Sequence, residues 1–400
     1  MNTFFYRIYQ FVLRIASYLV HWPIPTVLEG ENSVLKVPEI LTQKGISRVL
    51  LVTDKTITNL GLTAPLLQAL ATSGIETAVY DDTVPNPTID NIEKALELYR
   101  TSQASAIIAF GGGSAMDCAK GVGARASNPN KFIAQMRGLL KVAKPLPLLI
   151  AIPTTAGTGS ETTIAAVISN PETHEKYAIN DQKLVPAYAV LDPQLTVGLP
   201  PHITSTTGLD ALTHAVEAYI GRSNTAETRK AAREAVKLIF ENLYTAYSNG
   251  KDIEARANML KASFYAGVAF TRAYVGYVHA IAHTLGGYYS VPHGLANAVI
   301  LPVVLDHYGH VIDKPLAELA DLIGITQPGE SQSVKAGKFI EKIKELEASM
   351  NIPTKIEGIK ESDLPGMIHN ALREANPLYP VPQEFSADDF KTLYDTIRHV

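Results

Sequence analysis

The chain is 400 residues long, which at the usual ~100–200 residues per domain predicts about two domains. Apolar residues make up 46% of it and charged residues 18%, and the 35 Lys and Arg against 39 Asp and Glu provide no overall basic charge for binding nucleic acid. The single cysteine, Cys118, excludes an internal disulfide framework and a cysteine-rich zinc site, and it predicts a reducing compartment, the cytoplasm.

The N-terminal segment is unusual because residues 1–28 contain no acid. Its polar residues recur every three or four positions and form a narrow stripe on a predicted helix, at Thr3, Arg7, Gln10, Arg14 and Ser17. The uncharged stretch 15–28 is too short and too interrupted by proline to span a bilayer, and no secretory cleavage site follows it. We expect residues 1–25 to form an amphipathic helix packed on the body of the protein or on a second subunit. A helix lying in a membrane interface through residues 1–22 is the alternative.

From about residue 47, short apolar runs alternate with turns and helical stretches. Apolar runs bounded by turn residues are typical of parallel strands that are covered on both faces. The runs are 49–52, 76–80, 106–110, 148–152 and 187–191. The stretches between them are long enough for crossover helices, so residues 26–200 are predicted to form an α/β domain with a Rossmann-like parallel sheet.

After about residue 198, long helical periodicities replace the strands. They cover 209–219, 226–249, 255–273, 278–287 and 334–350, whereas 298–305 fits either a strand or a helix. The pair Pro200-Pro201 marks the boundary, and residues 201–400 are predicted to form an all-helical domain.

Two strand ends of the first domain are rich in glycine and hydroxyl groups. At 107–120 (IIAFGGGSAMDCAK) a strand meets three glycines and a helix start, where backbone N–H groups and the helix dipole favour an anion. The spacing is not G-x-G-x-x-G, and a tight turn that needs small residues is the alternative. A second such turn lies at 153–161 (PTTAGTGSE), and Asp54, at another strand end, is placed to bind a ribose or to cap a helix. Together these strand ends predict a nucleotide-type ligand.

The helical half holds one aspartate and four histidines in two otherwise apolar segments. Asp210 and His214 stand four residues apart on one helix face, as do His279 and His283, and His293 follows. One carboxylate and several imidazoles suit Zn²⁺ or Fe²⁺, and hydrogen-bonded core residues are the alternative. The spacing does not select among the three later histidines.

The two halves together predict a reaction. A divalent metal lowers the pKa of a bound hydroxyl, and an alcohol ionised in this way passes hydride to a nicotinamide. The residues therefore predict a metal-dependent dehydrogenase.

Four motifs resemble those of the iron-containing (group III) alcohol dehydrogenases and stand in the same order. They are GGGSAMDCAK, PTTAGTGSE, GLDALTHAVEAY and HAIAHTLGGYYSVPHGLANA, within a resemblance that runs over residues 26–305. The resemblance implies a dinucleotide-binding domain, an all-helical domain and a catalytic cleft between them, an architecture shared with dehydroquinate synthases and glycerol dehydrogenases. It also implies hydride transfer between NAD(H) and a metal-bound primary alcohol or aldehyde, with Fe²⁺ (or Zn²⁺) and NAD (or NADP) as cofactors, in a homodimer or larger oligomer.

Carried across by position, the resemblance assigns the metal to Asp210, His214, His279 and His293. It places His283 beside the nicotinamide, with a catalytic role in proton relay. The implied cofactor contacts are Asp54, Asn86, Gly112, Gly113, Ser114, Asp117, Thr154, Thr155, Thr158, Thr163 and Lys176. Asp54 matches a position that favours NAD over NADP.

Two other functions share this architecture, a metal-dependent lyase of the dehydroquinate synthase type and polyol oxidation like that of glycerol dehydrogenases. The lyase needs basic groups around a multiply anionic substrate, and 264–292 offers only Arg272 besides its histidines. The aromatic residues in that segment favour a modest apolar alcohol or aldehyde over a sugar phosphate, and a place in the helical core is the alternative for them.

Overall fold

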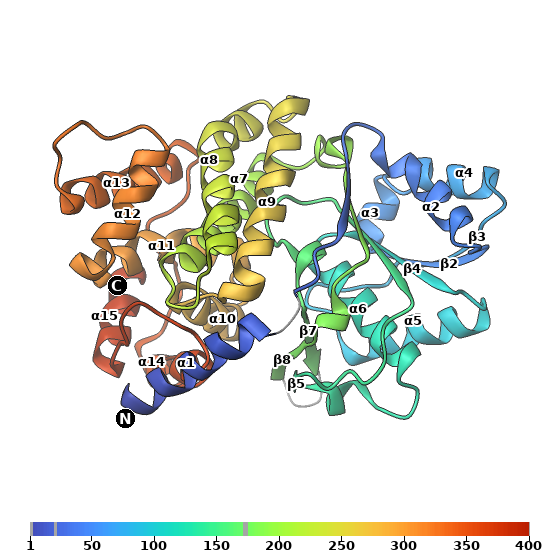
Figure 1. The fold of residues 1–400 in the computed structure, drawn as a ribbon, viewed down its shortest axis with the longest axis horizontal. Helices are drawn as coiled ribbons and strands as arrows, with labels where there is room; N and C mark the ends of the chain where they lie inside the picture. Colours follow the sequence, from blue (N-terminus) through green and yellow to red (C-terminus); the bar gives the residue numbers. More distant parts are fainter. Residues whose placement is uncertain (1–2, 20–21, 171–174, 400) are drawn as a thin grey trace. The chain divides into compact units, whose positions relative to one another are not determined.

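A computed structural model describes residues 3–19, 22–170 and 175–399. The chain divides into two compact units (Figure 1). The sheet unit is Trp22–Gly198, and the helical unit is Leu199–Val400 together with Met1–His21.

The sheet unit is built on six parallel strands, which confirms the predicted α/β fold. Their order is β1 (Thr26–Glu29), β9 (Tyr188–Leu191), β6 (Leu148–Pro153), β4 (Ala106–Gly111), β2 (Arg48–Val52) and β3 (Glu76–Tyr80). Strand β1 was not predicted from the sequence, because this edge strand has four residues, most of them exposed, and so lacks an apolar run.

Helices cover both faces of this sheet (Figure 1), which explains the continuous apolar runs. They are α2 (Val37–Gln43), α3 (Lys55–Asn59), α4 (Ala64–Thr72), α5 (Ile89–Thr101) and α6 (Gly113–Ser127). Along β2, Leu50 and Val52 pack into one core with residues of α5 and α6, whereas Val49 and Leu51 pack into another with residues of α2 and α4. Alternate residues of a strand point to opposite faces, so every position of β2 after Arg48 is buried.

A second, smaller sheet, with one strand before and two strands after the PTTAGTGSE turn, was not predicted. It consists of β5 (Gly138–Leu139), β8 (Glu175–Asn180) and β7 (Ala165–Asn170), with β7 and β8 antiparallel. The short helix η3 (Ser160–Thr162) connects the turn to this sheet.

The helical unit confirms the predicted all-helical half. It contains α1 (Thr3–Leu19), α7 (Pro201–Ile220), α8 (Ala226–Ser248), α9 (Ile253–Ala273), α10 (Tyr277–Tyr289), α11 (His293–Tyr308), α12 (Asp313–Leu322), α13 (Gln332–Ser349), α14 (Leu364–Ala375) and α15 (Ala387–Ile397). Within its described residues the only β-pairing is an isolated bridge between Ile356 and Arg398. The ambiguous stretch 298–305 is helical, inside α11.

One helical stretch of the described chain, His293–Leu322, is long and apolar enough to cross a membrane. However, 61% of its most apolar window is buried inside the protein, and α11 packs against α7, α10, α13 and α15. Its apolar composition is therefore that of a core helix.

Glu347 on α13 predicts a pH dependence of stability. This side chain is buried, and its Oε1 has no hydrogen-bond partner among the described residues. Burial raises the pKa of Glu347 to about 8, and Lys344 opposes this only in part. Between pH 4.5 and 8 the folded protein thus keeps a proton that the unfolded chain has lost, so the free energy of unfolding falls as the pH rises.

We expect Glu347→Gln to remove this slope. The variant should be more stable than the wild type at pH 8, by on the order of 1–4 kcal/mol, and should show no such gain at pH 4.5. Urea unfolding at both pH values measures the difference. An identical pH slope in the two proteins would contradict the assignment.

Candidate active site

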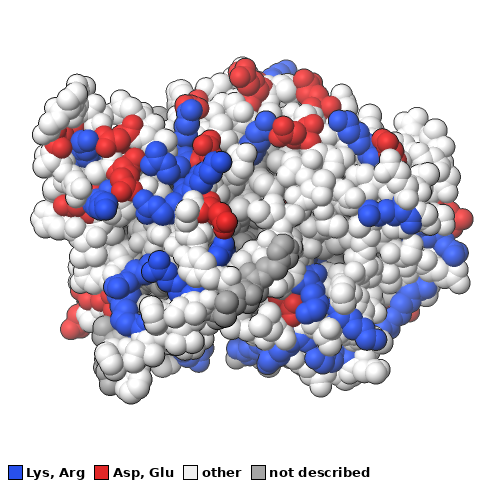
Figure 2. Space-filling view, in the orientation of Figure 1, with Lys and Arg blue, Asp and Glu red and all other residues white. Residues whose placement is uncertain are grey.

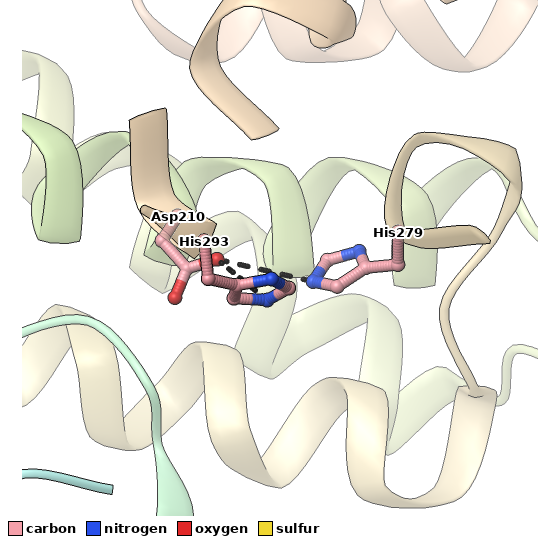
Figure 3. A group of neighbouring side chains, drawn as sticks. All are labelled: Asp210, His279 and His293. Carbon is pink, nitrogen blue, oxygen red and sulfur yellow. Dashed lines mark ion pairs between the residues drawn. The ribbon is translucent and has the colours of Figure 1, made fainter. Parts of the chain in front are cut away.

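Three potential metal ligands converge within the helical unit (Figure 3). Asp210 lies on α7, His279 on α10, and His293 is the first residue of α11. One ligand atom from each lies within 4.8 Å of the others. Asp210 Oδ1 is 3.9 Å from His279 Nε2 and 3.7 Å from His293 Nε2. Ligands bound about 2.1 Å from a tetrahedral ion are roughly 3.4 Å apart, so the three atoms are spaced to hold one cation after a small contraction.

The close approach of α11 to α7 depends on a glycine. A Cβ at Gly294 would lie 2.4 Å from the backbone oxygen of Thr206, and backbone gives way less readily than the end of a side chain. Glycine at this position therefore allows His293 to reach Asp210.

Glu217 orients His279 from behind. Its carboxylate accepts hydrogen bonds from the backbone N–H groups of Gly276 and Val278, each at 2.8 Å, and from Nδ1 of His279 at 2.6 Å. Because both carboxylate oxygens already accept N–H groups, the His279 proton resides on Nδ1, and the lone pair of Nε2 is directed at Asp210. Burial raises the pKa of Glu217 to about 7, although the three hydrogen bonds to its carboxylate act in the opposite direction. Burial also lowers the pKa of His279.

Asn297, one turn after His293, shows that the site suits a cation. Its Nδ2 lies 2.6 Å from Asp210 Oδ1 and 3.2 Å from Nε2 of both His279 and His293. Two N–H bonds cannot satisfy three acceptors at once. The Asn297 Oδ1 is also buried, with no hydrogen-bond partner among the described residues. A divalent cation, which the donor set of one carboxylate and two imidazoles suits, would satisfy the acceptors that the amide cannot.

The other two predicted histidines lie beside this group. His214 stacks on His279, with ring centroids 4.5 Å apart, and on Phe270 at 4.1 Å. His283 stacks on His293 at 5.2 Å, and its Nδ1 lies 2.6 Å from Glu374 Oε1. Their roles as ligand and as proton relay stay predictions.

In the sheet unit, the glycine turn leaves helix N–H groups for an anion. Gly111 has a φ of +151°, and a Cβ there would lie 2.8 Å from Cβ of Ala115, so this position requires glycine. Gly112 is the N-cap of α6 and makes no side-chain cap hydrogen bond. The first N–H groups of α6 are thus not used by a cap.

The second turn lies next to the first. Gly111 pairs with Pro153 across β4 and β6, and the N–H of Thr154 donates to the Gly111 oxygen at 3.0 Å. The side chains of Thr155 and Thr158 lie against Gly112 and Gly113. Both turns therefore lie at the carboxyl ends of neighbouring strands, where open α/β sheets bind ligands.

Most predicted cofactor residues gather at these strand ends. Ser114 Oγ accepts a hydrogen bond from the N–H of Asn86 at 3.1 Å. Asp54 caps α3 through Oδ1, which accepts the N–H of Ile57 at 3.1 Å, while its Oδ2 faces the position of Gly111. Lys176 is part of β8, but its side chain lies outside the described residues.

Asp117 and Thr163 take part instead in a network around Lys120. The Lys120 Nζ donates to the backbone oxygens of Ser160 (2.7 Å), Thr163 (2.9 Å) and Ala165 (2.9 Å), and lies 2.7 Å from Thr163 Oγ1. Asp117 accepts a hydrogen bond from Ser160 Oγ at 3.1 Å. Burial lowers the pKa of Lys120 to about 8, against the attraction of Asp117 and Glu161. This buried cation holds the second turn against α6.

Three residues of these sites were not predicted from the sequence: Glu217, Asn297 and Lys120. Each stands in a quoted motif at helical spacing from a predicted site residue. Glu217 is two turns after Asp210, Asn297 one turn after His293, and Lys120 one turn after Asp117. This helical spacing, which places each residue on the same helix face as a predicted site residue, is the sequence feature that could have identified them.

Comparisons with known proteins agree with this geometry. Residues 25–193 match the family described as iron-containing alcohol dehydrogenase, and residues 204–398 match the C-terminal part of the same family. A 1,3-propanediol dehydrogenase of Klebsiella pneumoniae is 40% identical over 351 residues, 87% of this chain and 90% of that protein.

Two solved structures are also similar. A 1,3-propanediol oxidoreductase has a TM-score of 0.90 and 37% identity, covering 94% of this chain and 98% of its own. A sulfoacetaldehyde reductase of Bifidobacterium kashiwanohense, in complex with NAD⁺, has a TM-score of 0.83 and 28% identity, covering 94% and 99%. The chain belongs to the iron-containing alcohol dehydrogenase family. It is an oxidoreductase acting on CH–OH groups, an alcohol dehydrogenase or aldehyde reductase.

Lys120→Met should destabilise the protein. The variant removes a buried cation and leaves the oxygens of Ser160, Thr163 and Ala165 without this donor. We expect the free energy of unfolding to fall by about 3–5 kcal/mol, measured in urea. Lys141→Met, at an exposed position in the same unit, is the control and should change it by less than about 0.5 kcal/mol. Equal stability of the two variants would refute the role given to Lys120.

Glu217→Gln should weaken metal binding without unfolding the protein. A glutamine keeps the shape but replaces one accepting oxygen by an N–H₂ group that opposes the N–H groups around it. We expect iron affinity to fall about 10–100-fold, measured as iron per chain against graded chelator. Glu241→Gln, on the exposed surface of α8, is the matched control. If both variants hold iron as tightly as the wild type, Glu217 does not support the ligand.

Proposed function

We propose that this protein is an NAD(H)-linked, Fe²⁺-dependent alcohol dehydrogenase or aldehyde reductase of the cytoplasm, working as a homodimer or larger oligomer. The observation that carries the proposal is the convergence of Asp210, His279 and His293 around an amide that cannot satisfy all three. The fourth proposed ligand is His214, which is stacked on His279.

Asp210, His279 and His293, with His214 as the fourth proposed ligand, would hold a divalent iron. The iron would supply a Lewis acid that lowers the pKa of an alcohol hydroxyl or polarises an aldehyde carbonyl. Glu217 and Asn297 keep the ligand atoms in place before the substrate arrives, so little reorganisation is needed. The Phe270 ring stacks on His214, and an aromatic side chain beside the fourth proposed ligand supports a small primary alcohol or aldehyde as substrate.

The contact of His283 with Glu374 supports a role for this histidine in proton transfer. Its Nδ1 lies 2.6 Å from Glu374, which also accepts a hydrogen bond from the hydroxyl of Tyr379 at 2.7 Å. The Glu374 carboxylate stabilises a protonated His283, since an opposite charge favours the charged form. The exposed imidazole can therefore take the hydroxyl proton during oxidation and return it during reduction.

The sheet unit supports NAD as the partner in hydride transfer. The N–H groups at the start of α6 suit its pyrophosphate, with Ser114, Thr155 and Thr158 beside them. The Oδ2 of Asp54 faces the glycine turn at Gly111, which supports a role for this carboxylate in accepting a ribose hydroxyl and repelling a 2′-phosphate, and so supports NAD over NADP.

Removal and return of the metal tests the proposal. Chelated enzyme should form no NADH from a panel of short primary alcohols, and adding Fe²⁺ anaerobically should restore stoichiometric NADH formation. The rate of NADH formation with NAD⁺ should exceed the rate of NADPH formation with NADP⁺. Asp210→Asn should lower turnover by about 10³-fold or more, because a lost ligand removes several kcal/mol of transition-state stabilisation.

The control is Asp388→Asn on the exposed start of α15, which should leave turnover unchanged. Full activity in the chelated enzyme or in Asp210→Asn would contradict the metal assignment. Consumption of a substrate without net NADH formation would indicate a lyase instead.

A further inference from the structure

The N-terminal helix α1 is attached to the helical unit through its polar stripe. Gln10 is only 6% exposed, and its Nε2 donates to the backbone oxygens of Pro377 (3.2 Å) and Tyr379 (2.9 Å). Arg7 donates to the backbone oxygen of Val381 at 2.8 Å and pairs with Glu384 at 3.2 Å. The polar stripe of the helix therefore faces the protein at Arg7 and Gln10.

The apolar side of α1 is exposed as a consequence. Phe4, Phe5 and Phe11 have 67%, 63% and 61% of their surface exposed, and Val12 and Ile15 are exposed as well. We call these five residues the apolar face of α1. This arrangement is the reverse of a surface helix of a globular protein, and a contiguous exposed apolar patch marks an interaction site.

A basic pocket adjoins this face. Arg14 and Tyr18 of α1 line a pocket of about 490 Å³ with Arg229, Lys230 and Arg233 of α8, and Glu234 is the one acid that lines it. Arg229 is held in place by Glu318 and by the Tyr219 ring, 4.1 Å below its guanidinium. Figure 2 shows basic side chains next to uncharged surface at the lower left, where Figure 1 places α1.

The apolar face and the pocket form one continuous surface. Phe4, Phe11 and Tyr18 follow one another at intervals of seven residues, so they lie along one side of the helix, and Tyr18 lines the pocket. The two features are therefore available to the same partner.

The area of this surface and its charges both favour an anionic bilayer over a second copy of this chain as the partner. A strip one helix wide and 17 residues long offers on the order of 300 Å², well below the roughly 800 Å² per partner of a stable protein interface. In a twofold contact the same surface meets its copy, so four basic side chains would approach four others. Anionic lipids present the opposite charge, and they lie beside the acyl chains that would cover Phe4, Phe5 and Phe11.

We propose that α1 docks this protein on anionic membranes, with the apolar face at the boundary between head groups and acyl chains and lipid phosphates at the basic pocket. Nothing in this docking requires the metal centre or the nicotinamide. It would place an otherwise globular oxidoreductase at a lipid surface, where apolar alcohols and aldehydes concentrate.

Vesicle co-sedimentation of the full chain tests this inference. The wild type should bind vesicles of phosphatidylcholine with phosphatidylglycerol at low salt, and bind pure phosphatidylcholine much less. Phe5→Asp/Phe11→Asp should lower the partition coefficient roughly tenfold or more. Lys230→Glu/Arg233→Glu should remove most of the gain due to the anionic lipid, because each basic residue near the surface contributes about five-fold.

Matched variants control for the number of charges introduced. Phe132→Asp/Leu140→Asp places two acids on exposed apolar positions of the sheet unit, and Lys314→Glu/Lys355→Glu reverses two exposed charges of the helical unit. Both should bind vesicles as the wild type does, and all four variants should keep the wild-type dehydrogenase activity.

Two results would overturn the inference. One is wild-type protein that stays in solution with anionic vesicles. The other is a loss of oligomeric mass in Phe5→Asp/Phe11→Asp, measured by analytical ultracentrifugation, with vesicle binding unchanged, which would mean that a second copy covers the apolar face.

Discussion

The metal centre depends on the carboxylate of Glu217, which connects the last turn of α7 to the first turn of α10. It accepts two backbone N–H groups at the start of α10 and the Nδ1 proton of His279, so it fixes the helix start and the imidazole at the same time. A buried carboxylate is costly unless its oxygens are hydrogen-bonded, and here both are. The constraint places His279 Nε2 opposite Asp210, and Gly294 lets α11 bring His293 to the same point.

The sheet unit uses a buried charge in a similar way. Lys120 donates to three backbone oxygens, one at the end of the PTTAGTGSE turn and two in the segment that follows it, and so holds both against α6. Gly112, the N-cap of α6 at the first turn, has no side chain with which to cap the N–H groups of that helix. In each unit a buried ionisable group, Glu217 or Lys120, thus fixes a segment that carries candidate ligand-binding residues.

The parts that follow from local pattern were predictable from the sequence. Strands such as β2 and β4 are buried on both faces, so they appear as uninterrupted apolar runs, whereas the exposed edge strand β1 does not. Asp210 and the later histidines could be recognised because helical spacing and residue chemistry are both visible in the sequence. The selection among the histidines was not predictable from spacing, because it depends on which ring nitrogen a tertiary contact directs inward.

The residues that act through tertiary contacts could not be predicted. Asn297 and Glu217 resemble ordinary helix residues until α7, α10 and α11 are brought together. Which face of α1 packs on the protein could not be predicted from the sequence for a related reason. Its amphipathic pattern predicts two faces, but only the contacts of Gln10 and Arg7 with the loop after α14 show that the polar face is the inner one.

The most direct test of the account is anomalous X-ray diffraction at the iron edge, on crystals grown anaerobically with Fe²⁺. The account predicts one strong peak about 2.0–2.3 Å from a carboxylate oxygen of Asp210 and from Nε2 of His279 and His293, with His214 as the fourth ligand. A peak bound elsewhere, or no peak among Asp210, His279 and His293, would contradict it.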